Sequence, residues 1–117
     1  STFHEFDPEL ASIHQERRRA ERETEMMFSS PDGEQFNIPR VETYDNDVLH
    51  LNVHYERVRT PEFERMPEPQ REAILGHLYQ HEERLRAAQE ASFQRTMMMK
   101  GAPGQKGTPS PPKQSGQ

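Results

Sequence analysis

Four histidines are the residues whose type and spacing could carry chemistry in this chain. His50 and His54 are four residues apart, and His77 and His81 repeat that spacing. Residues at i and i+4 share one face of an α-helix, so two facing helices could place four imidazoles around one zinc ion in tetrahedral geometry. A catalytic zinc site of the H-E-x-x-H type is not indicated, because leucine rather than glutamate follows His50 and His77.

A second interpretation of the histidines requires no metal. Imidazoles at the edge of an apolar helix face commonly hydrogen-bond to carboxylates or backbone carbonyls across an interface. The candidate acceptors in and around the same segments are Asp45, Asp47, Glu56 and Glu82. We favour this interpretation and predict neither a metal nor a cofactor, while the four histidines stay the candidate ligands of the alternative.

Other catalytic patterns are missing from the sequence. It contains no dinucleotide-binding G-x-G-x-x-G, no P-loop and no G-x-S-x-G nucleophile elbow. It also contains no cysteine, which excludes disulfides, thiolate-ligated metal sites and thiol nucleophiles. Its many glutamates are interpreted as solvated helix faces, so we predict that the chain is not an enzyme.

The composition predicts a small core that is completed by partners. Leucine, isoleucine, valine and phenylalanine make only 19 of the 117 residues, and a share under about 20% is typical of disordered or partner-dependent chains. The formal net charge of −5 argues against nucleic acid as the main partner. No apolar run approaches the roughly 20 residues that span a bilayer, so no membrane contact is predicted.

Residues 1–28 are predicted to form a helical arm. Asp7 is a suitable N-cap and Pro8 suits the first helical turn. The three arginines at 17–19 are flanked by glutamates, and we expect them to form a solvated, ion-paired face. Apolar residues recur along the arm with helical spacing, at Leu10, Ile13, Ala20 and Met27.

Residues 29–46 are predicted to form an extended connector. The segment 29–33 contains serine, proline, aspartate and glycine, which favour a turn. Beyond it, Phe36, Ile38 and Val41 alternate with polar residues, which is compatible with a short extended stretch. Pro39 would keep that stretch at a sheet edge.

Residues 47–100 are predicted to form an antiparallel helical hairpin. Asp45 or Asn46 caps its first helix, and Thr60 precedes the proline that ends it. The second helix is expected to begin near Pro69 or Gln70. Seven apolar side chains are predicted to close the hairpin or to contact a partner: Val48, Leu51, Tyr55, Val58, Ile74, Leu78 and Leu85.

The fold class that follows is mainly α. It comprises a long N-terminal helix, a connector, the helical hairpin and an extended Gly/Pro-rich C-terminal tail at 101–117. That tail has too few apolar residues to build a core and is predicted to be flexible.

Short motifs follow one another in a distinctive order from residue 39 to about residue 90. They are Pro39-Arg40-Val41-Glu42, an Asp-Asn turn at 45–46 before the first histidine pair, Thr60-Pro61-Glu62-Phe63, Met66-Pro67-Glu68, and Ile74-Leu75-Gly76 before the second pair. This order resembles the C-terminal region of portal proteins of tailed bacteriophages. In that family the module lies on the capsid-interior side of the portal ring. Portal proteins are several times longer, and their channel-lining stem has no counterpart here, so DNA translocation is not implied.

The resemblance implies a structural virion protein of a tailed-phage head, located in the virion and, during assembly, in the host cytoplasm. It would assemble at the portal vertex as a homo-oligomer or with portal and capsid proteins, and contact with packaged DNA is not indicated. The Ser1 start favours a separately encoded protein over a detached part of a larger portal. The alternatives are a capsid decoration, scaffold or minor head protein, or, in a different class, a histidine-rich metal-binding helical module.

Overall fold

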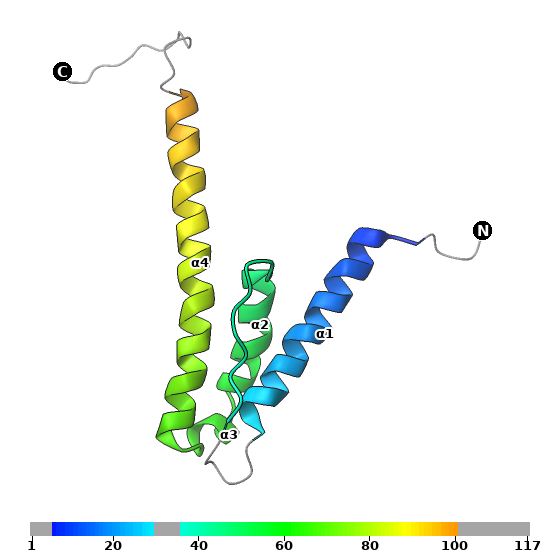
Figure 1. The fold of residues 1–117 in the computed structure, drawn as a ribbon, viewed down its shortest axis with the longest axis vertical. Helices are drawn as coiled ribbons and strands as arrows, with labels where there is room; N and C mark the ends of the chain where they lie inside the picture. The colour runs from blue at the N-terminus through cyan, green and yellow to red at the C-terminus, as the bar shows by residue number, and fades with distance from the viewer. Residues whose placement is uncertain (1–5, 30–35, 101–117) are drawn as a thin grey trace, which may run out of the picture. The chain divides into compact units, whose positions relative to one another are not determined.

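The fold is mainly α-helical, as the sequence predicts. The computed structural model describes residues 6–29 and 36–100, and the described residues contain helices but no strand. The predicted turn at Ser30–Gly33 and the tail at 101–117 lie outside the described residues. The helices are α1 (Pro8–Phe28), α2 (Asp47–Val58), α3 (Pro61–Glu64) and α4 (Glu68–Lys100) (Figure 1).

Helix α1 begins where the sequence predicts. The Asp7 side chain accepts hydrogen bonds from the backbone N–H groups of Glu9 and Leu10, at 3.0 and 3.3 Å, and Pro8 occupies the first turn. The apolar stripe reaches the core only in the C-terminal half of α1, because Leu10 and Ile13 are about half exposed. The buried residues of α1 are Ala20, Glu23, Thr24, Met27 and Phe28.

Helix α2 follows a connector without regular structure over residues 36–46. Of the two predicted caps, Asn46 is the one used: its side chain accepts the backbone N–H of Leu49 at 3.1 Å. The helix ends at Val58, just before Thr60 and the proline that follows it, as expected. The predicted link is itself partly helical, since α3 lies within it and buries Phe63.

Helices α2 and α4 form the predicted antiparallel hairpin. Helix α4 begins at Glu68, one residue before the expected start. Side chains of the two helices contact each other. Asp47 bonds to Arg84, and the ring of His50 lies 5.0 Å from that of His81. In Figure 1, α2 lies between α1 and the first half of α4, so all three helices reach the space around the histidines.

The apolar core gathers at the closed end of this arrangement, from α1, α2, α3 and α4. It consists of Met27, Phe28, Leu51, Phe63, Met66, Ile74 and Leu78, with Ile38, Tyr55, Val58 and Leu85 packed against it. Six of the seven predicted contact residues are therefore part of, or packed on, the chain's own core. The seventh, Val48, is half exposed and stays a predicted partner contact.

Internal contacts divide the chain into two compact units, Ser1–Leu85 and Arg86–Gln117. All of the core described above belongs to the first unit. The described part of the second unit is the stretch of α4 from Arg86 to Lys100, where every side chain is exposed. Over the described helices, no stretch is long and apolar enough to cross a membrane.

Candidate metal centre

The four histidines singled out by their spacing meet in one buried cluster. His50 and His54 come from α2, and His77 and His81 from α4. Neighbouring rings have centroids between 4.9 and 5.8 Å apart. Each of the four residues is at most 1% exposed. The four rings meet because residues four apart lie on one face of a helix, and in both helices that face is directed toward the other helix.

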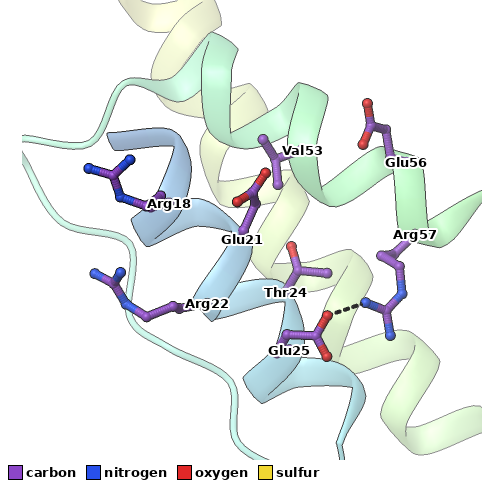
Figure 2. A pocket seen from close by; sticks show the side chains of 8 residues that line it. All are labelled: Arg18, Glu21, Arg22, Thr24, Glu25, Val53, Glu56 and Arg57. Carbon is purple, nitrogen blue, oxygen red and sulfur yellow. Dashed lines mark hydrogen bonds and ion pairs between the residues drawn. The ribbon is translucent and has the colours of Figure 1, made fainter. Parts of the chain in front are cut away.

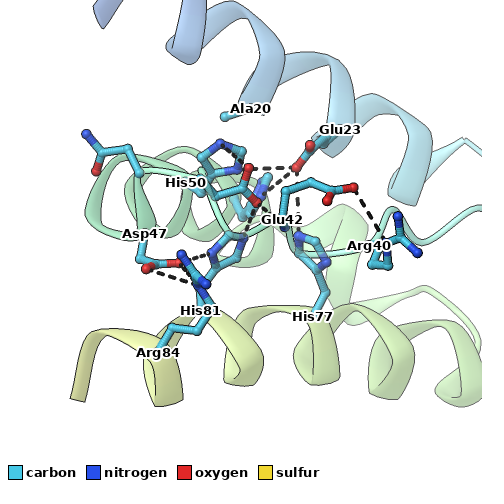
Figure 3. A network of polar contacts seen from close by, with 12 residues as sticks. Ala20, Glu23, Arg40, Glu42, Asp47, His50, His77, His81 and Arg84 are labelled. Carbon is cyan, nitrogen blue, oxygen red and sulfur yellow. Dashed lines mark hydrogen bonds and ion pairs between the residues drawn. The ribbon is translucent and has the colours of Figure 1, made fainter. Parts of the chain in front are cut away.

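Helix α1 adds a carboxylate to this cluster. The Oε1 atom of Glu23 lies 3.2 Å from Nδ1 of His50, 3.7 Å from Nε2 of His54 and 3.8 Å from Nε2 of His77. Figure 3 shows Glu23 descending from α1 toward the imidazoles of α2 and α4. Three helices therefore supply five side chains to one site.

Two of the histidines are held from outside the cluster by carboxylates. Nε2 of His50 lies 2.7 Å from Oε2 of Glu16, and Nδ1 of His81 lies 2.7 Å from Oδ1 of Asp47. An ionised carboxylate only accepts hydrogen bonds, so these outer nitrogens carry the protons and donate them. In a neutral ring the inner nitrogen then carries the lone pair. Nδ1 of His50 also lies 3.2 Å from Oε1 of Glu23, to which it donates when the His50 ring is protonated.

A hydroxyl holds the third histidine in the same way. Oγ1 of Thr24 donates to the carbonyl oxygen of Ala20 at 3.1 Å and lies 2.8 Å from Nδ1 of His54. Since the single hydroxyl proton is already used, Thr24 accepts a hydrogen bond from Nδ1–H of His54. This hydrogen-bond network assigns the lone pair to Nε2, which faces Glu23.

Arginines complete the outer layer of the site. Arg19 bonds to Glu16 at 2.9 Å and to Oε2 of Glu23 at 3.1 Å, and it also pairs with Asp45. Arg84 bonds to Asp47 at 3.0 Å. These contacts compensate the outer carboxylates and leave Oε1 of Glu23 directed inward. Metal-binding imidazoles usually have such partners on the nitrogen that faces away from the metal.

The inner atoms, in contrast, have no hydrogen-bond partner. They are Oε1 of Glu23, Nδ1 of His50, Nε2 of His54, Nε2 of His77 and Nε2 of His81, while the ring of His77 also interacts with the backbone of Pro39. Ligand atoms of His50, His54 and His81 all lie within 4.8 Å of one another, and so do those of Glu23, His54 and His77. Buried polar atoms are almost always paired. A set of such atoms facing one another is an arrangement that a bound cation would satisfy.

The protonation states of the site suit a metal at neutral pH. Burial lowers the pKa of His77 to about 4, and it lowers the pKa of His54 as well. Burial raises the pKa of Glu23, but its close contacts with the rings of His50 and His54 outweigh it and hold the pKa at about 2. Burial of His50 is outweighed by its Glu23 and Glu16 partners, which raise its pKa. Glu23 is thus ionised and the imidazoles of His54 and His77 are neutral, as metal ligation requires, whereas the His50 ring, with its raised pKa, would have to lose a proton when a metal binds.

The acceptors predicted for the histidines are partly those observed. Asp47 bonds to His81 as expected, and Asp45 approaches His50 and His81 at 3.9 and 4.0 Å. Glu82 accepts a hydrogen bond from Tyr55 instead, and Glu56 lines a surface groove.

Sequence reasoning missed the contribution of α1. Glu16 and Glu23 were grouped with the solvated face of the arm, yet both lie on the side of α1 that faces the histidines. The available signal was their spacing, because Glu16, Ala20, Glu23 and Met27 recur at i, i+4, i+7 and i+11 along one helix face. Arg19 is ion-paired, as the prediction for the arginines stated, but it points toward the site rather than into solvent.

Two surface grooves border α1, and neither is lined by a histidine of the cluster. The first runs between α1 and α2 and mixes arginine and glutamate side chains, with Glu25 and Arg57 bonded across it at 2.6 Å (Figure 2). Only Thr24 belongs to both this groove and the histidine network. The five inward-facing ligands are therefore closed off from both grooves. Neither family models, curated proteins nor solved structures gave a match to this chain.

Proposed function

We propose that this chain is a structural metal-binding module, in which one transition-metal ion bound by His50, His54, His77, His81 and Glu23 joins three helices. The observation that carries the proposal is the set of buried acceptor atoms that face one another without a hydrogen-bond partner. A bound cation would satisfy all five residues at once. Without it, each unpaired buried group costs about 1–3 kcal/mol.

The ligand chemistry favours a borderline transition metal. Four imidazole nitrogens and one carboxylate oxygen suit zinc, nickel, cobalt, copper or iron, whereas magnesium and calcium prefer oxygen ligands. Zinc is the best candidate, since it accepts nitrogen ligands at about 2.0–2.1 Å in a tetrahedral site. At that bond length the ligand atoms would be drawn to roughly 3.3 Å from one another, so grouped atoms that now lie as much as 4.8 Å apart would have to approach by up to about 1.5 Å.

The burial of the site supports a structural role over a catalytic one. Catalytic metal sites keep a coordination position open to water or substrate. Here the histidines are at most 1% exposed and Glu23 is 7% exposed, and neither groove beside α1 is lined by the histidines. Five protein ligands would fill a five-coordinate ion, and four of them would fill a tetrahedral one, so neither geometry leaves a vacancy.

Because the apolar core is small, a bound metal would contribute to the stability of the fold. The apolar cluster of the first unit consists of seven buried residues at one end of the helices, and a core this small supplies little free energy of folding, which a metal or a partner can supplement. The histidine cluster fills the middle of the three helices, where an ordinary domain would place leucine or valine. Metal binding free energy then becomes folding free energy.

For the biological setting, we propose a structural virion protein of a tailed-phage head, portal-like or portal-associated, that assembles with copies of itself or with other head proteins. The ordered motifs from residue 39 to about residue 90 support it, as do the exposed apolar side chains Phe93 and Met97 on α4. A capsid decoration, scaffold or minor head protein is the second candidate. Copy number in purified particles separates these roles: about a dozen copies indicates a portal-associated ring, hundreds indicate decoration, and none indicates a scaffold.

Metal content and thermal unfolding of the full chain test the metal proposal. We expect about one equivalent of zinc after loading and desalting, and a higher Tm with zinc than with a chelator. His77→Gln combined with His81→Gln should abolish the bound metal and the difference in Tm. His14→Gln removes an exposed histidine of α1 and is the matched control, which should behave as the wild type.

The same two measurements can also refute the metal proposal. If the wild type retained none of zinc, nickel, cobalt, copper or iron(II), and its Tm did not respond to a chelator, the proposal would be wrong. Cobalt substitution adds a readout that does not depend on stability, because the visible spectrum of bound cobalt(II) distinguishes tetrahedral from five-coordinate sites. The double variant should then give no such spectrum even where it stays folded.

A further inference from the structure

The contacts of α1 with the rest of the first unit differ sharply along its length. Its last turn is anchored by apolar packing: Met27 is fully buried, and the ring of Phe28 lies 6.1 Å from that of Phe63. Gln70 adds a hydrogen bond of 2.9 Å to the carbonyl oxygen of Met27. This end of α1 has all the features of a permanent contact.

The middle turns of α1 are held almost entirely by polar groups. Glu16, Arg19, Glu23 and Thr24 contact the hairpin or the connector, and each does so through a charged or hydroxyl group. The only fully buried apolar side chain in this stretch is that of Ala20, which contributes little hydrophobic area. The middle of α1 is therefore held by polar contacts, and Glu23 is the residue through which the inner atoms of the histidine cluster take part in them.

The N-terminal half of α1 adds no further anchor. Leu10 and Ile13 are 50% and 46% exposed, and the Asp7 cap stabilises only the helix itself. Once the middle turns detach, nothing described in the structure holds the first turns to the hairpin. Segments with few buried apolar contacts open locally at low free energy.

We infer that the metal centre is a lock for α1: metal bound through Glu23 holds residues 8–24 against the hairpin, and metal loss releases them while Met27 and Phe28 stay packed. The inference rests on the proposed metal-binding function and adds its regulation. Four of the five ligands belong to the hairpin, so the hairpin binds metal by itself. Glu23 is the single ligand through which the metal contacts α1.

Release of α1 would expose surfaces that a partner protein could contact. It uncovers the imidazoles of α2 and frees a helical arm whose buried face carries Ala20 and Thr24. The arm would be closed when metal is bound and available to a neighbour when it is not. Metal supply then determines whether this chain can exchange its arm during assembly.

Hydrogen–deuterium exchange of the full chain, read by peptide, tests this inference. With saturating zinc, protection of residues 8–24 should rise over the metal-free chain by the factor by which the closed site binds zinc more tightly than the hairpin alone. Residues 48–57 and 71–84 should retain most of their protection in both states. Glu23→Gln should still bind zinc through the four histidines yet lose the zinc-dependent protection of α1.

Glu21→Gln is the matched control, since Glu21 is exposed, lies on the same helix and lines only the groove beside α2. It should retain the wild-type response. Zinc binding with identical α1 exchange in both states would overturn the lock and leave the metal site standing. Zinc-dependent protection in Glu23→Gln would also overturn it, whereas failure of the wild type to bind metal would overturn the proposed function itself.

Discussion

Each ligand histidine that has an outer partner uses it to fix its tautomer. The clearest case is His81, whose Nδ1 donates to Asp47 while Arg84 bonds to the same carboxylate. These contacts turn Nε2 of His81 toward the inside of the cluster. Burial raises the pKa of Asp47, but Arg84 and His81 outweigh it and hold the pKa below its usual value. Asp47 is therefore charged when a metal binds.

Replacing Asp47 should weaken metal binding although Asp47 is not a ligand. We expect Asp47→Asn to lower zinc affinity by about 10- to 100-fold, the usual effect of losing the outer partner of a ligating histidine. Competition titration against a chromophoric chelator measures this change. Glu82→Gln is the control, because Glu82 bonds to Tyr55 and not to a histidine. Equal affinities for wild type and Asp47→Asn would contradict the assigned role.

Protonation of His77 should make the metal-free chain sensitive to acid. Its folded pKa of about 4 lies below the ordinary value of 6.5, so the unfolded chain binds the proton more tightly. Stability is complete above about pH 6.5 and is lost as the pH falls toward 4, by roughly 3 kcal/mol at most. Urea unfolding of the chelator-treated chain from pH 7.5 to 4.5 measures this loss.

A matched substitution isolates the contribution of His77 to the acid sensitivity. His77→Gln should flatten the pH dependence, and His14→Gln should leave its slope unchanged. The lowered pKa of His54 acts in the same direction, so a residual slope is expected. A slope in His77→Gln as steep as in the wild type would show that other groups cause the acid sensitivity.

At the scale of elements, helix boundaries were predictable because local chemistry determines them. Asp7 and Asn46 cap α1 and α2 through their own side chains, and the proline after Thr60 ends α2. The histidine spacing also predicted correctly which helices face each other. The side of α1 that packs on the hairpin was not predictable from apolar residues alone, since charged side chains such as Glu23 occupy it. Buried charge is rare enough that periodicity assigns it to the solvent.

Helix α4 contains a glycine that this fold does not require. Gly76 is exposed, and a Cβ added there would meet nothing within 4 Å, so the close approach of another backbone within the described chain does not explain it. Gly76→Ala should raise the free energy of unfolding by about 1 kcal/mol. Urea unfolding measures this, and the metal content should stay unchanged. A destabilised Gly76→Ala variant would show that α4 needs the glycine.

The apolar end of the hairpin should be as critical as the metal. Ile74 is completely buried within the core cluster, so Ile74→Ala should cost about 2–5 kcal/mol. Exposed Leu75 provides a neighbouring control, and Leu75→Ala should cost much less. Thermal unfolding in the presence of zinc compares the two. Similar losses for both variants would contradict the assignment of the core.

For the molecule as a whole, the exposed part of α4 in the second compact unit is the candidate surface for a partner. From Arg86 to Lys100 every side chain of α4 is exposed, and isolated helices of this length are marginal in water. Phe93 and Met97 lie four residues apart on one face of it. The low share of core-forming residues predicted dependence on partners, and this part of α4 is where that dependence would be met.

Self-association should therefore depend on the exposed face of α4. We expect Phe93→Ser combined with Met97→Ser to shift sedimentation of the zinc-loaded chain toward the monomer, with bound zinc unchanged. Met98→Ser, which alters an exposed neighbour on another face, should have a smaller effect. A wild type that stays monomeric at every concentration would exclude the homo-oligomer and leave a different protein as the proposed partner.

The antiparallel pairing of α2 and α4 has one more consequence. His50 faces His81 and His54 faces His77, so the four ligands meet in a single alignment of the two helices. Sliding α4 by one turn would place His77 opposite His50 and Ala73 opposite His54, which leaves one histidine of each pair without its counterpart. A hairpin joined by a short link and packed on few apolar residues could otherwise tolerate such a slip. The histidine positions thus specify the register of α2 against α4. A bound metal would stabilise only the hairpin that has this register.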